Sequence, residues 1–494
     1  YHILQLNYYA NRTQWRWLIN NHQKLASQQL ILLFTLPYII WPNIFTEAFL
    51  GLAFMLALIS NLPLIKPKKP LVITGRIMRM LAINFILIAG FQLWMLCKNQ
   101  FWQILGLSGL YLLTPVMPIV VNTILQPVER WLKNIYISSA RRMINDHHHL
   151  ITIGITGSYG KTSMKQYLYD LLKADFNTLV TPESYNTPIG IAHTIKHQLR
   201  ASHQFFVCEM GAAKKHEIKE LCDITNPQYG IITAIGQQHL ETFGSQQDII
   251  NTKFELADYI HENGMLVLNG DNSIIRDQLP CLQCPYLTYG LNPKNNFQAR
   301  NLQLSSQGTI FDLFHNGKKL ATISTPLIGQ HSVINLTGAI AMAIQLGANI
   351  KTIIRQAKTL TPPAHRLQLK KVGQDLIIDD SYNSNPNGCQ AALETLGMFN
   401  GVKIIITPGM VELGDQQDQL NRQFGQQIAE VCDYVFLVGA QQTQAIYDGL
   451  IDQKYDRAKI IIVDNFQTAI HQARALHHDQ AKVILIENNL PDNY

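Results

Sequence analysis

The stretch GITGSYGKTS, from Gly154 to Ser163, decides how the rest of this chain is interpreted. It overlaps the end of a short β-branched run, Leu150–Thr156, and leads into SMKQYLYDLLKA, which has the spacing of an amphipathic helix. A glycine loop between a strand and a helix directs backbone N–H groups at phosphate oxygens, and the helix N-terminus adds a partial positive charge. The sequence therefore predicts a phosphate-binding loop.

Two side chains of this loop have predicted roles. Lys161 would reach the β- and γ-phosphates, and the Thr162 hydroxyl would bind Mg²⁺. The spacing departs from GxxxxGK[ST], because Ile155 occupies the first glycine position. A Gly-Lys-Thr run between a strand and a helix still favours a bound nucleotide over a glycine turn without a ligand. The residues expected at the nucleotide are Gly157, Ser158, Gly160, Lys161, Thr162 and Ser163.

The first third of the chain contains apolar segments that are typical of membrane-spanning helices. Four apolar segments are near the roughly 17–25 residues that cross a bilayer. Their outer flanks are rich in Lys and Arg and their tight connections are not, which predicts two hairpins with both ends in the cytoplasm. A buried helical domain of a soluble protein is the alternative. The predicted spans are Leu30–Ile44, Ala48–Ile65, Met80–Cys97 and Phe101–Val121.

Length and composition narrow the remaining choices. A chain of 494 residues predicts two or more domains, and its mild net charge of +6 fits a membrane surface better than nucleic acid. No basic module with interleaved aromatics is visible, so no nucleic-acid partner is expected. Seven scattered cysteines indicate a reducing compartment. The lone CxxC at Cys281 and Cys284 has no second pair, and His147–His149 reads as a solvated linker.

The loop resembles the G-x-TG-[TS]-x-GKT loop of the Mur ligases and of their relatives, the folylpolyglutamate synthases. These are ATP-dependent enzymes that form amides. Further blocks resemble the member that joins D-alanyl-D-alanine to a muramoyl tripeptide, in the same order, from about Asn145 to the C-terminus. Thr187 and Ser332 each replace a family Asn, and TPGMVELG lacks a family Asp. The blocks are YNTPIGIAHTI (185–195), FVCEMGAAKKHEI (206–218), HLETFGSQQDIINTKFEL (239–256), LIGQHSVINLTGAIAMAIQLG (327–347), IIDDSYNSNPNGCQAAL (377–393) and TPGMVELG (407–414).

The resemblance implies an α/β chain with three parts. We expect transmembrane α-helical hairpins over residues 1–144, a central P-loop ATPase domain over 145–365 and a Rossmann-like domain over 366–494. The last domain is also indicated by five strand-like runs with helical stretches between them: DLIIDDS, VKIIITPG, YVFLVG, KIIIVD and KVILIE. In the family such a domain swings onto the central one, which excludes water from a labile acyl phosphate.

The resemblance also implies metal ligands. Thr162 and Glu209 would hold the Mg²⁺ that enters with ATP, and His239 would hold a second Mg²⁺. Lys253 matches a position that several members carbamylate, which turns a cation into an anionic metal ligand. A solvated helix lysine is the alternative for Lys253. Lys161, Glu209, His239 and Lys253 are thus the predicted catalytic residues.

Residues of the C-terminal part complete the implied nucleotide site. Arg366 would contact the phosphates through its bidentate fork, and Asp380 would contact the ribose. Asn335 is placed near the adenine, whereas Asp379 is expected to have a structural role. The loop that closes over nucleotide and acceptor contains Tyr382, Asn383 and Asn385.

The sequence departs from the family where the acyl substrate would be recognised. Nothing resembles the UDP-sugar domain, and ILIENNLPDNY stands where a KGS-like run is usual. The first hypothesis is a multi-pass ligase of the bacterial cell membrane, with cytoplasmic catalytic domains. It would join D-Ala-D-Ala, or another amine, to a muramoyl tripeptide or related carboxylate. A ligase for a lipid-linked precursor or for poly-γ-glutamate is the alternative. A transport ATPase and a non-catalytic scaffold have less support, because the loop spacing, the missing transporter signature and the intact site residues argue against them.

Overall fold

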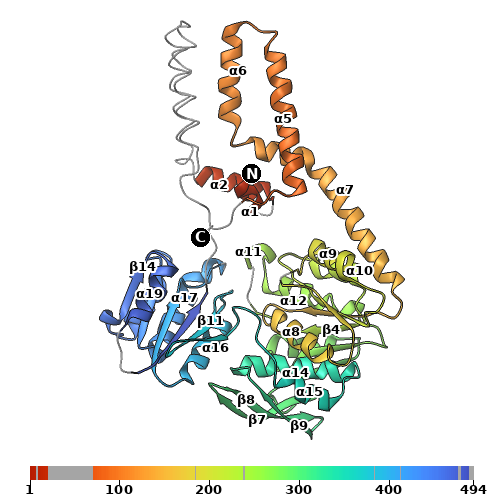
Figure 1. Ribbon diagram of the computed structural model, residues 1–494, viewed down its shortest axis with the longest axis vertical. Coiled ribbons are helices and arrows are strands. Elements are labelled where there is room, and N and C mark those ends of the chain that lie inside the picture. Colours follow the sequence, from red (N-terminus) through yellow and green to blue (C-terminus); the bar gives the residue numbers. More distant parts are fainter. Residues whose placement is uncertain are drawn as a thin grey trace. The chain divides into compact units, whose positions relative to one another are not determined.

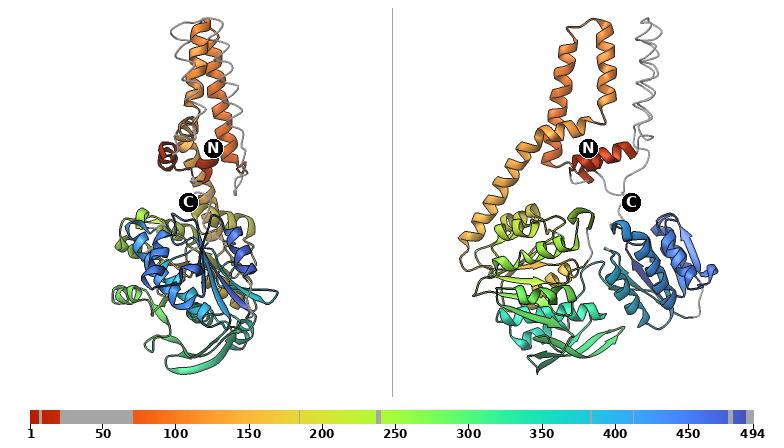
Figure 2. Two further views of the ribbon diagram at one scale, coloured as in Figure 1. Left: turned by 90° about the vertical axis from the view of Figure 1, so that its left-hand side faces the viewer. Right: turned by 180° about the vertical axis from the view of Figure 1, so that it is seen from behind.

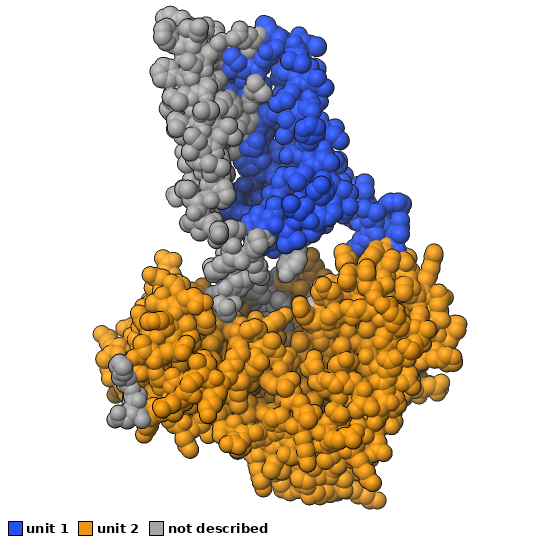
Figure 3. All heavy atoms as spheres, in the orientation of Figure 1, with its two compact units in different colours: residues 1–135, 492–494 blue, residues 136–491 orange. Residues whose placement is uncertain are grey.

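The computed structural model describes residues 1–6, 9–20, 71–183, 185–236, 240–382, 384–411, 413–476 and 480–488. The chain divides into two compact units (Figure 3), unit 1 with residues 1–135 and unit 2 with residues 136–491. Each is described by itself below. Unit 1 is helical in its described part, and unit 2 contains two β-sheets with helices on their faces.

The helices of unit 1 begin with two short ones and continue with an apolar pair (Figure 1). The pair, α5 and α6, runs antiparallel, and the two helices lie side by side in all three views (Figure 2). Gly106 of α6 faces the side chains of Phe91 and Met95 of α5. The last helix, α7, starts in unit 1 and ends in unit 2. The bounds are α1 His2–Leu6, α2 Asn11–Asn20, α5 Gly75–Met95, α6 Gln100–Leu113 and α7 Met117–Asp146.

A small core and a set of polar contacts join α1, α5 and α7 at the start of α5. Arg79 of α5 pairs with Glu129 of α7 through two hydrogen bonds of 2.7 and 3.0 Å. The buried Asn122 of α7 accepts from Arg76 at 2.8 Å and donates to Asn11 at 2.7 Å. The apolar residues packed at this junction are Leu4, Ile77, Met80, Val121 and Leu125.

The predicted membrane hairpins are not confirmed. Within the described part of the chain, α5 alone is long and apolar enough to cross a bilayer, by length and composition, and it is 11% buried. The predicted span Phe101–Val121 is wrong as one helix, because α6 ends at Leu113 and α7 begins at Met117. Pro115, which lies in this break, cannot donate a helical hydrogen bond. With 14 residues α6 is about 21 Å long, short of a bilayer core. The predicted spans Leu30–Ile44 and Ala48–Ile65 lie outside the described residues.

The first sheet of unit 2 has nine described strands in the order β2-β3-β1-β4-β5-β6-β7-β8-β9. Strands β1 to β7 pair in parallel, and β7, β8 and β9 pair antiparallel. The chain passes to opposite sides of β1, because β3 and β4 flank it, so a ligand crevice is expected at its carboxyl end. The bounds are β1 Ile151–Thr156, β2 Thr178–Val180, β3 Phe205–Glu209, β4 Tyr229–Ile232, β5 Met265–Asn269, β6 Tyr286–Gly290, β7 Phe297–Ser305, β8 Gly308–His315 and β9 Lys318–Thr325.

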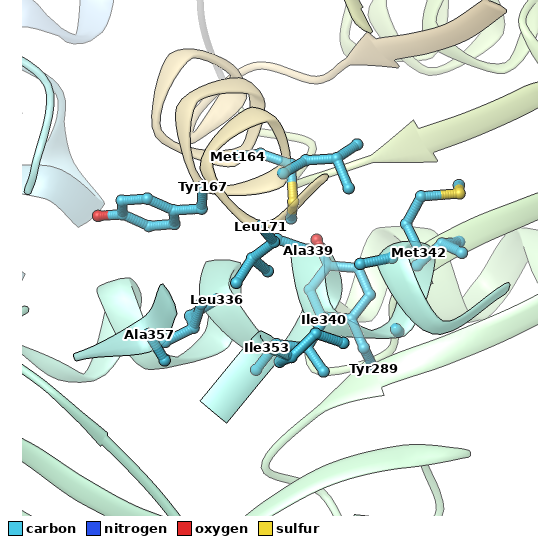
Figure 4. Packing of buried hydrophobic residues seen from close by; sticks show 14 of the residues in the cluster. Met164, Tyr167, Leu171, Tyr289, Leu336, Ala339, Ile340, Met342, Ile353 and Ala357 are labelled. Carbon is cyan, nitrogen blue, oxygen red and sulfur yellow. The ribbon is translucent and has the colours of Figure 1, made fainter. Parts of the chain in front are cut away.

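Alternating apolar residues of the parallel strands explain why both faces of this sheet carry helices. Phe205 and Val207 pack into one core, and their neighbours Phe206 and Cys208 pack into the other. The first core holds α8, α14 and α15, where Met164 and Leu171 meet Leu336 and Ile340 (Figure 4). The second holds the end of α7 and the helices α9, α10, α12 and α13. The bounds are α8 Lys161–Leu172, α9 Pro188–Gln198, α10 Glu217–Thr225, α11 Leu240–Phe243, α12 Gln246–Phe254, α13 Ser273–Gln278, α14 Gln330–Gln345 and α15 Ile350–Ala357.

The second sheet has six described strands in the order β10-β11-β15-β12-β13-β14, of which β10 is antiparallel and the others are parallel. The five predicted strand-like runs are β11 to β15, and β10 is an additional edge strand. The helices α16, α17, α18 and α19 accompany them (Figure 1). The bounds are β10 Gln368–Val372, β11 Asp375–Asp380, α16 Pro386–Gly397, β12 Val402–Thr407, α17 Gln417–Val431, β13 Tyr434–Val438, α18 Gln444–Asp452, β14 Ile460–Val463, α19 Phe466–Ala475 and β15 Lys482–Glu487.

The α/β class predicted for the region after the first third is confirmed by these two sheets. The predicted domain limits at 144/145 and 365/366 stay predictions. The second of them falls between α15 and β10, where the described chain is irregular, and unit 2 already begins at Tyr136. Ala140 and Ile144 of α7 belong to the second core of the first sheet.

Candidate active site

The glycine loop lies between β1 and α8 and has the backbone that its sequence predicts. Gly157 has φ +147° and Gly160 has φ +79°, where side chains are strained. A Cβ on Gly157 would lie 2.2 Å from Thr233 Oγ1, so the loop cannot hold a larger residue there. The Ser158 hydroxyl donates to the Gly236 carbonyl at 3.1 Å, and Ser163 lies beside the Tyr167 hydroxyl in the first turn of α8.

Lys161 is folded back onto this loop. Its Nζ donates to the carbonyl oxygens of Gly157 at 2.7 Å and Ser158 at 3.1 Å. Burial lowers the pKa of Lys161 to about 8, Glu209 raises it, and Arg366 lowers it. The end of β3 and Arg366 are therefore close enough to Lys161 for their charges to act on it. A lysine that already binds two carbonyl groups of the loop can exchange them for phosphate oxygens without entering from solvent.

Glu209 is the last residue of β3 and is 2% exposed. Its Oε1 accepts from Thr162 Oγ1 at 3.2 Å and from Asn186 Nδ2 at 3.1 Å. Its Oε2 lies 3.0 Å from Lys165 Nζ but accepts no hydrogen bond in the described structure, because the ion pair lies off the hydrogen-bond direction. A hydroxyl and a carboxylate with one open oxygen match what Mg²⁺ uses beside nucleotide phosphates. The residues present thus fit the predicted metal.

Lys253 is buried near the end of α12, 2% exposed, so it is not a solvated helix lysine. Its Nζ donates to the Ala212 carbonyl at 3.4 Å. Burial first, and then the charge of Lys161, hold the pKa of Lys253 well below its ordinary value. A neutral amine is the form that reacts with CO₂, so this environment favours the carbamylation that the resemblance implies. The predicted ligand His239 lies outside the described residues.

Arg366 lies just before the second sheet of unit 2, and Asp380 lies at the end of its strand β11. The Arg366 guanidinium lies 4.4 Å from the centre of the Tyr382 ring, and Tyr382 is half exposed. Asp380 ends β11 and accepts from the Leu367 N–H at 3.2 Å. Burial raises the pKa of Asp380 to about 6, although Arg366 acts in the opposite direction. Of these two residues, Arg366 is close enough to Lys161 for its charge to lower the pKa of that lysine.

Three further predictions meet different outcomes in the geometry. Asn335 of α14 lies against the phosphate loop, since a Cβ on Gly160 would be 3.0 Å from its Oδ1. Asn385 caps α16 by accepting from the Gly388 N–H at 2.9 Å, which commits its side-chain oxygen to the fold. Asp379 contacts His365, Lys370 and Ser381, as a structural carboxylate does. Asn383 lies outside the described residues.

Sequence reasoning missed two sets of residues. Lys165 and Asn186 both contact Glu209, yet Lys165 was only part of the predicted helix and Asn186 only part of the block 185–195, with no role given to either. Glu487, at the end of β15, pairs in register with Asp380 and is 1% exposed. Ser384 donates to its Oε1 at 2.9 Å, and burial together with Asp380 raises the pKa of Glu487 well above its ordinary value. A carboxylate that ends an apolar strand was the available signal.

The cysteines of the lone CxxC and the histidine run were predicted to take no part in this site, whereas Cys389 contacts Glu487. Within the described ranges no three His, Cys, Asp or Glu side chains gather as a metal cluster. Cys281 is exposed, Cys284 is partly buried, and both thiols are free. The Nδ1 of His147 lies 2.6 Å from the Met143 carbonyl in the last turn of α7.

Two family models match the chain: the Mur ligase middle domain over residues 155–343, and the glutamate ligase domain of Mur ligases over 365–487. A UDP-N-acetylmuramoyl-tripeptide–D-alanyl-D-alanine ligase of Bacillus subtilis is 30% identical over 58% of this chain and 62% of its own length. The Escherichia coli enzyme of the same name is 29% identical over 58% of this chain and 64% of its own. The chain thus spans about three-fifths of these curated relatives.

Solved structures give the same picture for the fold. A MurF structure from Acinetobacter baumannii superposes with a TM-score of 0.66 and 26% identity, over 72% of this chain and 77% of that one. MurF of Thermotoga maritima, solved with ADP, superposes with a TM-score of 0.65 and 24% identity, over 72% of this chain and 80% of that one.

Proposed function

This chain belongs to the Mur ligase family, and on that premise we propose that it is an ATP-dependent amide ligase of peptidoglycan-precursor synthesis. It would activate a carboxylate as an acyl phosphate and join it to an amine, with ADP and phosphate as the other products. The proposed substrates are a muramoyl tripeptide and D-Ala-D-Ala. They come from the names of the relatives that match about three-fifths of their length to this chain.

One observation carries the proposal. Thr162 of the phosphate loop lies 3.2 Å from the buried Glu209 at the end of β3, and the charges of Glu209 and Arg366 both shift the pKa of Lys161. We infer that the phosphate loop, a carboxylate suited to a metal and an arginine suited to phosphate act at one site. Acyl activation by ATP needs these three, because negative charge gathers on the phosphates, the carboxylate and the leaving ADP.

The side chains of the site have distinct proposed roles. Lys161 and Arg366 would hold the phosphates, and the loop N–H groups would bind their oxygens. Asp380, beside Arg366, would accept hydrogen bonds from the ribose. Thr162 and Glu209 would hold Mg²⁺, whose chemistry is to neutralise phosphate charge. Closure of the second domain would exclude water from the acyl phosphate.

Lys253 is proposed to be carbamylated. The support is that its amine is buried and that burial holds the pKa of Lys253 well below its ordinary value. We expect Lys253→Ala to lose most of its turnover and to recover part of it with added short carboxylates, which replace the missing anion. A variant that folds and is not rescued would count against the carbamate. Mass spectrometry is a weaker measurement, because the adduct is labile.

Membrane attachment is proposed from α5. A helix of 21 residues with Phe85 73% and Leu93 66% exposed leaves a large apolar surface for lipid to cover. Its flanking arginines, Arg76 and Arg79, are consistent with a cytoplasmic end. The number of membrane spans is left open. The location of the catalytic domains in the cytoplasm stays a prediction from the sequence.

The test is ADP release by the detergent-solubilised chain. The reaction contains Mg²⁺-ATP and UDP-muramoyl tripeptide, with and without D-Ala-D-Ala. We expect release that requires both substrates and that disappears in Lys161→Ala. Lys173→Ala is the matched control, because Lys173 caps the same helix, is 46% exposed and pairs with Asp170 away from the site.

The other outcomes separate the alternatives. ATP binding without turnover on the soluble nucleotide would refute that substrate and favour a lipid-linked precursor. Turnover with glutamate alone would favour a polymerising ligase. ATP hydrolysis that ignores every carboxylate and amine would refute a ligase, and a chain that binds no ATP would refute an enzyme of this family type.

A further inference from the structure

Lys165 forms a buried ion pair that the proposed chemistry does not use. It lies one helical turn after Lys161 on α8 and is 3% exposed. Its Nζ is 3.0 Å from Glu209 Oε2 and also donates to the backbone carbonyl of Glu183. Removing an ammonium group and a carboxylate from water is costly. The placement of this charge against a proposed metal ligand therefore needs an explanation.

Lys165 stands at the one oxygen of Glu209 that remains available. Thr162 and Asn186 both donate to Oε1, whereas Oε2 accepts no hydrogen bond in the described structure. Oε2 is the atom that a metal ion would approach. A fixed ammonium group 3.0 Å away repels a divalent cation from that atom, and low polarity around the pair strengthens the repulsion.

The wider charge balance acts in the same direction. The ammonium group of Lys161 is close enough to Glu209 for the two charges to influence each other. Together with Lys165 it places two cationic side chains near one carboxylate. A lone divalent cation is therefore opposed there, whereas nucleotide phosphates are attracted. Once phosphates are present, their negative charge offsets the lysines and supplies further oxygen ligands for the metal.

We propose that Lys165 makes metal binding depend on the nucleotide. Its ammonium group keeps free divalent cations from Glu209, and it is offset when the nucleotide enters. This rests on the nucleotide and metal site of the proposed function. The Glu183 carbonyl gives Lys165 a second acceptor, so the ammonium group can leave Oε2 to the metal without losing every partner. Lys165 is thus a positioning residue that acts through Glu209.

The test measures Mn²⁺ binding to the full chain in detergent by electron paramagnetic resonance, with and without ADP, after subtraction of Mn²⁺ held by free ADP. In the wild type we expect ADP to tighten Mn²⁺ binding about tenfold or more. In Lys165→Met we expect Mn²⁺ alone to bind about tenfold more tightly, and the effect of ADP to shrink accordingly.

Two variants control this comparison. Lys165→Arg keeps the charge and should bind Mn²⁺ alone as weakly as the wild type. Lys173→Met removes one positive charge from the same helix at an exposed position, and it should also match the wild type. Thermal unfolding of each variant reports whether it folds.

Two results would overturn the inference. One is a wild type that binds Mn²⁺ equally with and without ADP, a measurement that needs no variant. The other is a folded Lys165→Met whose affinity for Mn²⁺ alone is unchanged or weaker, which would make Lys165 only a support for the Glu209 side chain. Because binding is measured, a chain that shows the coupling but never releases ADP would refute the proposed function and leave this inference standing.

Discussion

In each sheet of unit 2, carboxylates stand at the ends of strands. The surroundings of these carboxylates differ between the two sheets. At the end of β3, Glu209 Oε2 forms an ion pair with Lys165 Nζ at 3.0 Å. At the ends of β11 and β15, Asp380 and Glu487 lie in register with raised pKa values. Glu487 has a hydroxyl rather than a cation as its hydrogen-bond partner. The first arrangement suits the proposed metal ligand, and the second favours a carboxyl group that holds a proton.

The difference follows from which neighbours each strand end meets. β3 ends opposite the first two turns of α8, which carry Thr162 and Lys165. β15 ends between two strands and opposite the start of α16, where Ser384 and Cys389 are neutral donors. A buried carboxylate without a cation is stabilised by protonation instead. Similar residues at similar positions in a fold therefore serve different chemistry.

The largest effect is expected at the charged carboxylate. Glu209→Gln removes the proposed metal ligand and leaves the buried Lys165 without its counter-charge. We expect ADP release to fall by about 100-fold or more and the free energy of unfolding to fall by about 3 kcal/mol. Turnover assays and urea unfolding measure the two losses. Equal turnover in Glu209→Gln and the wild type would remove the contrast between the two strand ends.

The next effect concerns the loop that faces this carboxylate. In Gly157→Ala the new Cβ meets Thr233 Oγ1, so the loop must shift and ADP affinity should fall about tenfold or more. Gly347→Ala is the control, because its φ of +89° is also strained but no heavy atom lies within 4 Å. Isothermal titration with ADP separates the clash from the strain. Equal losses in both variants would show that backbone strain alone decides.

A pH effect tests the protonated side. Because the folded pKa values of Asp380 and Glu487 are raised, the folded state binds protons that the unfolded state has released. The free energy of unfolding should therefore fall as pH rises from about 4 through 6 and above. Glu487→Gln should weaken that fall by about 1–3 kcal/mol between pH 5 and pH 8, as measured by urea unfolding. If the free energy of unfolding of Glu487→Gln fell with pH as steeply as that of the wild type, Glu487 would not be protonated in the folded protein.

The smallest effect sharpens the same site. Ser384→Ala removes the hydroxyl that donates to Glu487 at 2.9 Å. We expect a loss of about 1 kcal/mol in the free energy of unfolding, because the Cys389 thiol remains a donor. ADP release should stay within about twofold of the wild type. A tenfold loss of turnover would instead move Glu487 from the fold into the chemistry.

Much of unit 2 was predictable because its signals are local. Gly157 and Gly160 between a strand and a helix predict the phosphate loop. The five parallel strands of the second sheet are predicted by continuous apolar runs. Lys161, Thr162 and Glu209 followed from the loop and from the end of β3. The edge strand β10 was missed, since Gln368–Val372 contains two lysines and few apolar residues.

What the sequence could not supply is pairing between distant segments. Lys165 and Glu209 are 44 positions apart, and Ser384 and Glu487 are 103 apart, so no local pattern connects them. The break at Pro115 was visible but was outweighed by the apolar run around it. Hydropathy measures how well a segment would dissolve in lipid, whereas a helix ends where its hydrogen bonds end.

The strand order of the second sheet has a consequence for protein synthesis. Of its described strands, β15 leaves the ribosome last, yet it lies in the interior of the sheet between β11 and β12. Until Lys482–Glu487 have emerged from the ribosome, β11 and β12 lack the strand that lies between them. The backbone N–H and C=O groups on one edge of each strand then have no β-sheet partner. A message or nascent chain cut short before these residues therefore yields a protein with a divided sheet. Such a product exposes strand edges that chaperones and proteases can bind, so the fold itself marks incomplete copies.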